Sequence, residues 1–135
     1  FSQEQLRLDG NAIECRINAE SAQDGFRPCP GRIAEWVPPE GPGIRVDSHC
    51  YAGYMVPPFY DSLLAKLITR GRDRHEAVER MKYALSGFVV SGIDTTIPFH
   101  QIILRHPDYL EGNVNTRWVE EVLLKNHYRG NAIGP

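Results

Sequence analysis

An alternation of apolar and polar residues near the start of the chain imposes a β-strand with two unlike faces. From Asn11 to Glu20 the sequence reads Asn-Ala-Ile-Glu-Cys-Arg-Ile-Asn-Ala-Glu. Successive side chains of a strand point to opposite faces, so one face collects small and apolar residues and the other collects polar and charged ones. The first face consists of Ile13, Cys15, Ile17 and Ala19, and the second of Glu14, Arg16, Asn18 and Glu20.

Arg16 stands on the charged face, flanked by acids and an amide. Same-face neighbours lie about 6.6 Å apart, which is close enough to hold the arginine head group without neutralising it completely. A guanidinium held in this way suits the recognition of a planar anion. A strand whose solvent face is simply charged is the alternative, because charged residues prefer exposed positions.

Two more strands are predicted after a loop and are expected to pair with each other. Residues 21–32 hold so many Gly and Pro residues that they predict a compact loop without regular structure. Residues 32–37 and 44–49 have strand character, and the stiff connection over residues 38–43 is rich in Pro and Gly. This arrangement predicts a hairpin.

Further strand patterns complete the predicted sheet. Residues 51–56 predict a short strand that Gly53 interrupts and residues 57–58, both Pro, end. Residues 62–69 are apolar on both faces, which is typical of a strand buried in the interior of a sheet. Residues 89–90, both Val, can add an edge strand.

Helical spacing replaces strand alternation in the second half of the chain. Asp73 is a suitable N-cap with Glu76 as its capping-box partner, and Gly87 ends the helix that they begin. A second helix is predicted over about residues 95–105, with a proline in its first turn, and a third from about residue 115 onward.

Strands first and helices afterwards predict the α+β class rather than a doubly wound sheet. The expected architecture is an antiparallel sheet of short strands from the N-terminal half, packed with about three helices from the C-terminal half. Residues 1–9 are predicted to be the remnant of a linker, and the domain to occupy residues 10–135. Because the first residue is Phe1 and not methionine, the chain is expected to be a piece of a longer protein.

Composition excludes several classes of function. The chain has 135 residues, which matches one ordinary domain, and 15 basic against 17 acidic side chains give a formal net charge of −2. Neither this balance nor any run of Lys and Arg supplies the positive charge that would attract the phosphates of a nucleic acid. No apolar run approaches the roughly 20 residues of a membrane span, and the sequence shows no charged start followed by the apolar stretch that marks a signal peptide. A cytoplasmic location is therefore expected.

The sequence contains no self-contained active site. Its three cysteines are far apart and are expected to be buried thiols, and its five histidines share no common period, so no metal ligand is assigned. A Gly-x-x-x-x-Gly-Lys phosphate loop and a Gly-x-Ser-x-Gly nucleophile elbow are both absent from the sequence.

Four dense motifs nevertheless follow one another along the chain. They read Glu-Cys-Arg-Ile-Asn-Ala-Glu, Pro-x-Pro-Gly-Arg-Ile, Gly-Pro-Gly-Ile-Arg-Val-Asp-Ser-His and Gly-Tyr-Met-Val-Pro-Pro-Phe-Tyr-Asp-Ser-Leu. In this order they closely resemble the C-terminal domain of biotin carboxylases, over about residues 11–122. That family provides the biotin-carboxylating component of acetyl-CoA, propionyl-CoA and pyruvate carboxylases, in which this domain packs against an ATP-grasp domain.

The resemblance implies an ATP-driven reaction in which bicarbonate is activated and a biotin ureido nitrogen is carboxylated. It implies biotin on a carrier protein, ATP and Mg²⁺ as cofactors of the full enzyme, with none expected on this fragment and with the ATP and metal ligands expected before Phe1. The implied partners are the preceding ATP-grasp domain, a biotin carboxyl carrier protein, a carboxyltransferase and a second copy in a homodimer.

The resemblance also assigns roles to residues of the active site. The arginine that matches Arg16 faces the active site and stabilises bicarbonate and the enolate oxygen of biotin; an always-protonated guanidinium can do this but cannot act as a base. Glu14 and Asn18 are assigned to binding or orienting the substrate; the alternative for them, and for Glu20, is ordinary hydrogen bonds that hold Arg16 and the following loop. Asp61 is a carboxylate partner for an arginine or, equally, a buried turn acid.

Three other positions concern the nucleotide and the dimer. Thr116 matches a position that approaches the adenine of ATP, and a helix cap is the alternative. Arg45 matches a dimer-contacting arginine, and Pro42 stands where relatives often carry a bulkier apolar residue, so both are assigned to the dimer interface. A surface arginine without a partner is the alternative for Arg45.

Two hypotheses of function follow from these assignments. The first is the C-terminal domain of a biotin carboxylase, inactive alone, that contributes to the biotin and bicarbonate site and to dimerisation. The second is a non-catalytic assembly module that keeps the fold. The setting of Arg16 favours the first, because a scaffold does not need a charged face there. The acyl acceptor is left open, as is whether the parent is a separate subunit or a fused chain.

Overall fold

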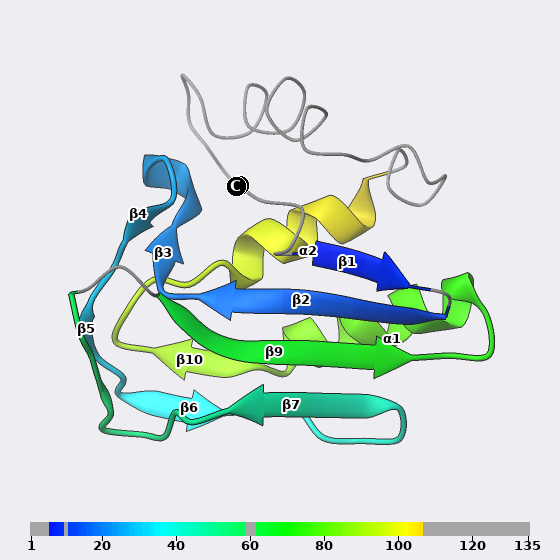
Figure 1. Ribbon diagram of the computed structural model, residues 1–135, viewed down its shortest axis with the longest axis horizontal. Helices are drawn as coiled ribbons and strands as arrows, with labels where there is room; N and C mark the ends of the chain where they lie inside the picture. The colour runs from blue at the N-terminus through cyan, green and yellow to red at the C-terminus, as the bar shows by residue number, and fades with distance from the viewer. Residues whose placement is uncertain (1–5, 10, 59–61, 107–135) are drawn as a thin grey trace.

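The alternating segment near the start of the chain forms an inner strand of a four-stranded antiparallel sheet. The computed structural model describes residues 6–9, 11–58 and 62–106. Strand β2 (Ala12–Asn18) lies between β1 (Leu6–Asp9) and β9 (Leu63–Arg70), and β7 (Ile44–Ser48) follows β9 at the other edge (Figure 1). The predictions for β2 and for the buried strand β9 are confirmed.

Residues 6–9 belong to the sheet and not to a linker. Strand β1 pairs with β2 in antiparallel register, from Leu6 opposite Cys15 to Asp9 opposite Ala12. This pairing occupies backbone groups of β2 that would otherwise need water. The linker prediction for residues 1–9 is therefore wrong for residues 6–9, where weak side-chain periodicity concealed a strand that backbone pairing holds.

The predicted hairpin between the second and third strands does not form. Strand β6 (Glu35–Val37) pairs with β10 (Val89–Ser91), whereas β7 pairs with β9. Both strands bury apolar side chains against the same core: β7 packs Ile44 and Val46 on it, and Trp36 of β6 packs edge-to-face on Phe88 with ring centroids 5.3 Å apart. Each strand therefore reaches this core while paired with a strand far away in the sequence, and not with the other.

Short paired segments replace the predicted irregular loop after β2. Strand β3 (Glu20–Ser21) pairs with β4 (Arg27–Pro28) across the 3₁₀ turn η2 (Ala22–Asp24). Strand β5 (Gly31–Arg32) pairs with β8 (Met55–Val56), the part of the predicted strand 51–56 that is formed. The expectation of no regular structure over residues 21–32 is therefore wrong, although each element is only two or three residues long.

Both helices with described residues begin and end where the sequence predicts. Helix α1 (Arg74–Ser86) starts at Asp73, whose carboxylate accepts a hydrogen bond of 2.8 Å from the Glu76 backbone N–H, and ends at Gly87. Helix α2 (Ile97–Arg105) has a proline in its first turn. These elements confirm the α+β class; the predicted third helix lies outside the described residues.

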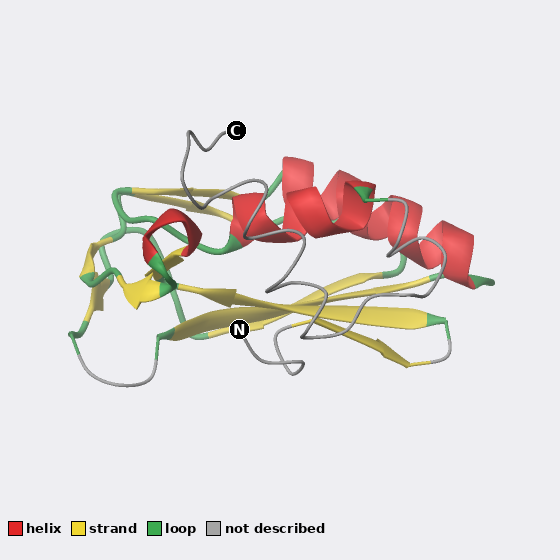
Figure 2. Cartoon of the chain, turned by 90° about the horizontal axis from the view of Figure 1, so that it is seen from above, coloured by secondary structure: helices red, strands yellow, loops and turns green. Residues whose placement is uncertain are grey.

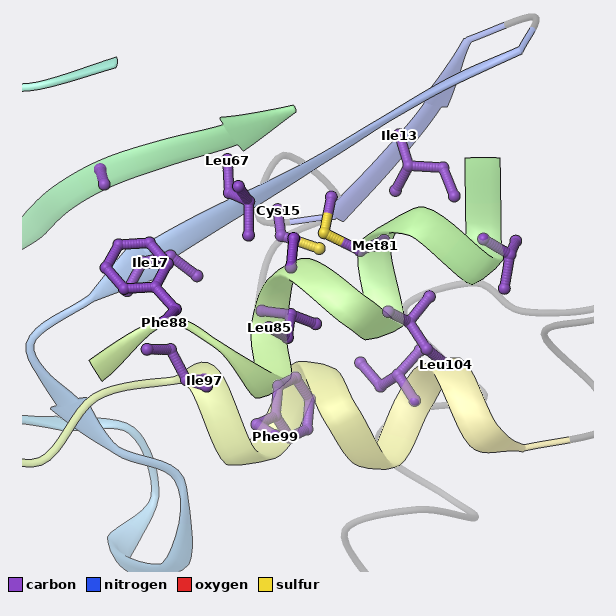
Figure 3. Packing of buried hydrophobic residues seen from close by; sticks show 14 of the residues in the cluster. Ile13, Cys15, Ile17, Leu67, Met81, Leu85, Phe88, Ile97, Phe99 and Leu104 are labelled. Atoms are coloured by element: carbon purple, nitrogen blue, oxygen red, sulfur yellow. The ribbon is translucent and has the colours of Figure 1, made fainter. Parts of the chain in front are cut away.

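The helices cover one face of the sheet. Figure 2 shows them in a layer on one side of the strands, and Figure 3 shows side chains of β2 and β9 meeting those of α1 and α2. The apolar face of β2 is fully buried there, while its charged face points away from both helices. The centre of this core consists of Ile13, Cys15, Ile17, Leu67, Met81, Leu85, Phe99, Ile103 and Leu104.

Among the described residues, no helix is both long enough and apolar enough to cross a membrane. The longer of the two, α1, has 13 residues.

Candidate functional site

A row of three charged residues crosses the face of the sheet that α1 and α2, the two α-helices of the described residues, leave uncovered. In the strand register Arg16 of β2 lies opposite Lys66 of β9, and Lys66 lies opposite Asp47 of β7. Directly paired side chains on one face of an antiparallel sheet have Cβ atoms about 5 Å apart, so the row is continuous. Arg16 and Lys66 place two cations side by side, which is an arrangement suited to an anion.

Glu14 holds the guanidinium of Arg16 by charge. Its Oε2 lies 3.5 Å from Arg16 Nε, and the two side chains are 20% and 30% exposed, respectively. Arg16 Nε is buried and has no hydrogen-bond partner among the described residues. A separation of 3.5 Å is long for a hydrogen bond, so Glu14 orients the arginine without a strong, directional bond. This geometry fits an orienting role for Glu14.

The other polar residues at the end of β2 are tied to the backbone nearby. Asn18 is buried, and its Oδ1 has no hydrogen-bond partner in the described part of the chain. Its backbone N–H donates to Thr96 Oγ1, and its backbone carbonyl accepts from the Thr96 N–H, both at 3.0 Å. Glu20 Oε2 accepts a hydrogen bond of 2.7 Å from Ser62 Oγ, which links the strand end to the start of β9.

The backbone carbonyl of Arg16 accepts two hydrogen bonds from α2 and the residue before it. His100 Nε2 lies 2.9 Å from this oxygen and Thr96 Oγ1 lies 3.2 Å from it. Neither residue is among those assigned to the site from the sequence. No local pattern reveals these contacts, because the partners are 80 and 84 positions apart in the sequence.

His100 is completely buried and neutral. Burial lowers the pKa of His100 to about 4, although the hydrogen bond to the Arg16 carbonyl opposes this shift. Because a carbonyl oxygen can only accept, the proton of the neutral ring lies on Nε2, and Nδ1 has no partner among the described residues.

We expect the free energy of unfolding of this chain to fall as the pH is lowered below 6.5. The pKa of a histidine is about 6.5 in an unfolded chain, so the unfolded state binds more protons than the folded state between pH 6.5 and about 4. Stability that is fully present above pH 6.5 is therefore lost on acidification, by about 2 kcal/mol at pH 5. Urea titrations at pH 8 and pH 5 measure the loss. A His100→Gln variant that loses as much as the wild type would show that other groups cause it.

The two residues assigned to a dimer interface lie on different sides of the sheet. Arg45 Nε is 2.9 Å from Asp47 Oδ1 on the uncovered face, and both side chains are exposed. This hydrogen bond and the charge of Asp47 raise the pKa of Arg45. Pro42 instead lines an open groove of about 470 Å³ with Tyr83 of α1, on the helix side. The structure thus does not bring Pro42 and Arg45 together.

Asp61 and Thr116, which were also assigned to the site from the sequence, lie outside the described residues.

The three cysteines are all free thiols. Cys15 is fully buried, and burial raises the pKa of its thiol, so the expectation of a buried thiol is confirmed for it. Cys29 and Cys50 are partly buried. In the described part of the chain no group of His, Cys, Asp and Glu side chains is placed to hold a metal ion.

Proteins of known function are similar in sequence to this chain over most of its length. A family model described as "Biotin carboxylase C-terminal domain" matches residues 14–121. The biotin carboxylase of Nostoc sp. is 54% identical over 122 residues, which are 90% of this chain and 27% of that protein. Biotin carboxylase 1 of Bacillus subtilis is 53% identical over 120 residues, which are 89% of this chain and 27% of that protein.

Solved structures agree with these sequence matches. The biotin carboxylase domain dimer of the Hydrogenobacter thermophilus 2-oxoglutarate carboxylase, in complex with MgADP, ADP and bicarbonate, superposes with a TM-score of 0.82 at 44% identity. The match covers 92% of this chain and 27% of that one. The chain therefore spans about a quarter of the length of these three relatives.

Proposed function

The chain belongs to the biotin carboxylase C-terminal domain family, and from this membership we propose that it forms the Arg16 side of a biotin and bicarbonate site in ATP-dependent carboxylation of carrier-bound biotin. The single observation that carries the proposal is the setting of Arg16, whose partly exposed side chain lies next to Glu14 on a face that no described helix covers. The solved bicarbonate-bound relative has the same fold.

The chemistry of Arg16 fits the demands of this reaction. Bicarbonate is an anion with a planar arrangement of oxygens, and negative charge grows on oxygen atoms as the carboxyl group is transferred. The guanidinium stays protonated and offers a planar fork of N–H donors. Pre-oriented by Glu14, Arg16 stabilises that charge without having to reorganise during the reaction. The neighbouring Lys66 adds a second positive charge in the same row.

We also propose how the rest of the enzyme completes the site. The part of the uncovered face around Arg16, on β2, is where the ATP-grasp domain packs, because burial there removes water from around Arg16 and strengthens its electrostatic effect. The residues that hold ATP and Mg²⁺ then belong to that domain, and the biotin carboxyl carrier protein and the carboxyltransferase act on the assembled enzyme. The proposed location is the cytoplasm.

Carboxylation assays of the full-length protein that carries this domain test the proposed function. With radiolabelled bicarbonate, we expect labelled carboxybiotin to form only when ATP, Mg²⁺ and biotin are all present, together with bicarbonate-dependent hydrolysis of ATP. A folded full-length protein that binds ATP but neither hydrolyses it nor labels biotin would support the alternative, a non-catalytic assembly module.

We propose that the full-length protein is a homodimer and that Arg45 lies at the interface. Arg45 is held by Asp47 on the edge strand β7 and is exposed in the single chain. An Arg45→Glu substitution places a second negative charge beside Asp47 and is expected to raise the dissociation constant of the dimer about tenfold or more. Sedimentation equilibrium measures this constant.

A matched substitution controls for the change of charge. Arg72 is also an exposed arginine near a carboxylate, at 3.5 Å from Glu76, but it lies in the turn before α1. Arg72→Glu is expected to leave the dissociation constant unchanged. An Arg45→Glu variant that sediments like the wild type would contradict the assignment of Arg45.

A further inference from the structure

Two buried side chains of the α2 segment are aimed at the backbone of the residue that carries the guanidinium. Thr96 Oγ1 and His100 Nε2 both donate to the carbonyl oxygen of Arg16, at 3.2 and 2.9 Å. Thr96 and His100 are each 0% exposed. We propose that Thr96 and His100 are positioning residues that fix the orientation of the Arg16 side chain in the site. This inference rests on the proposed function of Arg16.

The need for such positioning follows from the course of β2. The register between β2 and β9 shifts between Ile17 and Asn18, and the described pairing with β1 ends at Cys15. Among the described residues, the backbone from Arg16 to Asn18 is therefore paired regularly only with β9, and only as far as Ile17. Thr96, the residue before α2, holds the end of this stretch, because it exchanges two hydrogen bonds of 3.0 Å with the backbone of Asn18.

The two donors on one carbonyl constrain the peptide that sets the Arg16 side chain. A carbonyl oxygen has two lone pairs, and Thr96 and His100 occupy both of them. Rotation of this peptide would break both hydrogen bonds inside a buried region, where an unsatisfied polar group is unfavourable. Because a misplacement of about 1 Å at a reacting group can cost about a hundredfold in rate, this restraint matters for catalysis.

Paired substitutions at each position test the proposal in the full-length enzyme. Thr96→Val keeps the shape of the side chain and removes the hydroxyl, whereas Thr96→Ser keeps the hydroxyl. At position 100 both variants carry an amide, but the amide nitrogen of His100→Gln reaches the place of Nε2 and that of His100→Asn falls short. We expect Thr96→Val and His100→Asn to lower kcat/KM for biotin about tenfold with the KM for ATP unchanged. Thr96→Ser and His100→Gln should stay within about threefold of the wild type.

A double-mutant cycle separates positioning from a general loss of stability. If Thr96 acts through Arg16, Thr96→Val should lower kcat/KM in the wild-type background but cause no further loss in the Arg16→Ala background. An equal loss in both backgrounds, or equal activities of His100→Gln and His100→Asn, would overturn the proposal. A normal rate for Arg16→Ala alone would instead refute the proposed function of Arg16. If His100→Asn does not fold, the Thr96 pair and its cycle decide the question.

Hydrogen exchange supplies a readout that does not depend on activity. The Asn18 amide proton is bonded to Thr96 Oγ1, so its exchange should be at least tenfold faster in Thr96→Val than in Thr96→Ser. Unchanged protection of this amide in Thr96→Val would contradict the proposal that Thr96 holds the β2 backbone.

Discussion

Replacement of Arg16 by alanine in the full-length enzyme is expected to lower the turnover of biotin carboxylation about a hundredfold. Removal of a donor that stabilises a developing oxyanion costs on the order of 3 kcal/mol in the activation barrier. Arg16 qualifies as such a donor because its charge is permanent and because Glu14, 3.5 Å away, orients it. Steady-state rates with saturating ATP, bicarbonate and biotin measure the effect on kcat.

The control for Arg16 is an arginine with a similar partner but no place in the proposed site. Arg27 forms an exposed ion pair with Asp24 beside η2, and Arg27→Ala should leave kcat unchanged. Arg16→Lys keeps the charge but loses the planar fork of donors, so its rate should fall between those of the wild type and Arg16→Ala. An Arg16→Ala enzyme with normal turnover and normal thermal stability would contradict the assignment.

Local patterns explain how much of the fold could be predicted from sequence. Alternation predicted β2, an apolar run predicted β9, and the Asp73 cap with Gly87 predicted α1, because each signal lies within a few residues of the structure it indicates. The choice of partner for each strand could not be predicted in this way. Strand β6 pairs with β10 some 50 positions later in the sequence, and nothing local to either strand indicates that choice.

The candidate site follows the same division. Glu14 and Arg16 are two residues apart on one strand, so the sequence could predict that their side chains share a face. Thr96 and His100 lie in a distant segment of the sequence and bond the backbone carbonyl of Arg16. Every residue type has this carbonyl, so the residue at position 16 gives no indication of the contact. His100 therefore carries no local signal, because only the fold reveals what its Nε2 meets.

Truncation of Phe99 to alanine is expected to be the most destabilising of the substitutions considered for this chain. Phe99 is 0% exposed and packs edge-to-face on Phe26 with ring centroids 4.9 Å apart. Loss of a fully buried phenylalanine ring typically costs 3–5 kcal/mol, so a loss of about 4 kcal/mol in the free energy of unfolding is expected. Urea titrations at pH 7.5 and 25 °C, in solution conditions where the unfolding is reversible, measure it.

Phe99 also connects the core with the two residues that bond the Arg16 carbonyl, since it lies between Thr96 and His100 in the sequence. Tyr83→Ala is the matched control, because it also truncates an aromatic ring on a helix, but Tyr83 is 68% exposed. This substitution should change the free energy of unfolding by less than about 0.5 kcal/mol. Phe99→Leu, which keeps most of the apolar volume, should lose markedly less stability than Phe99→Ala. If Phe99→Ala were no more destabilised than Tyr83→Ala, the Phe99 ring would not hold α2 on the sheet. Other side chains of α2 would then have to keep Thr96 and His100 in place against β2.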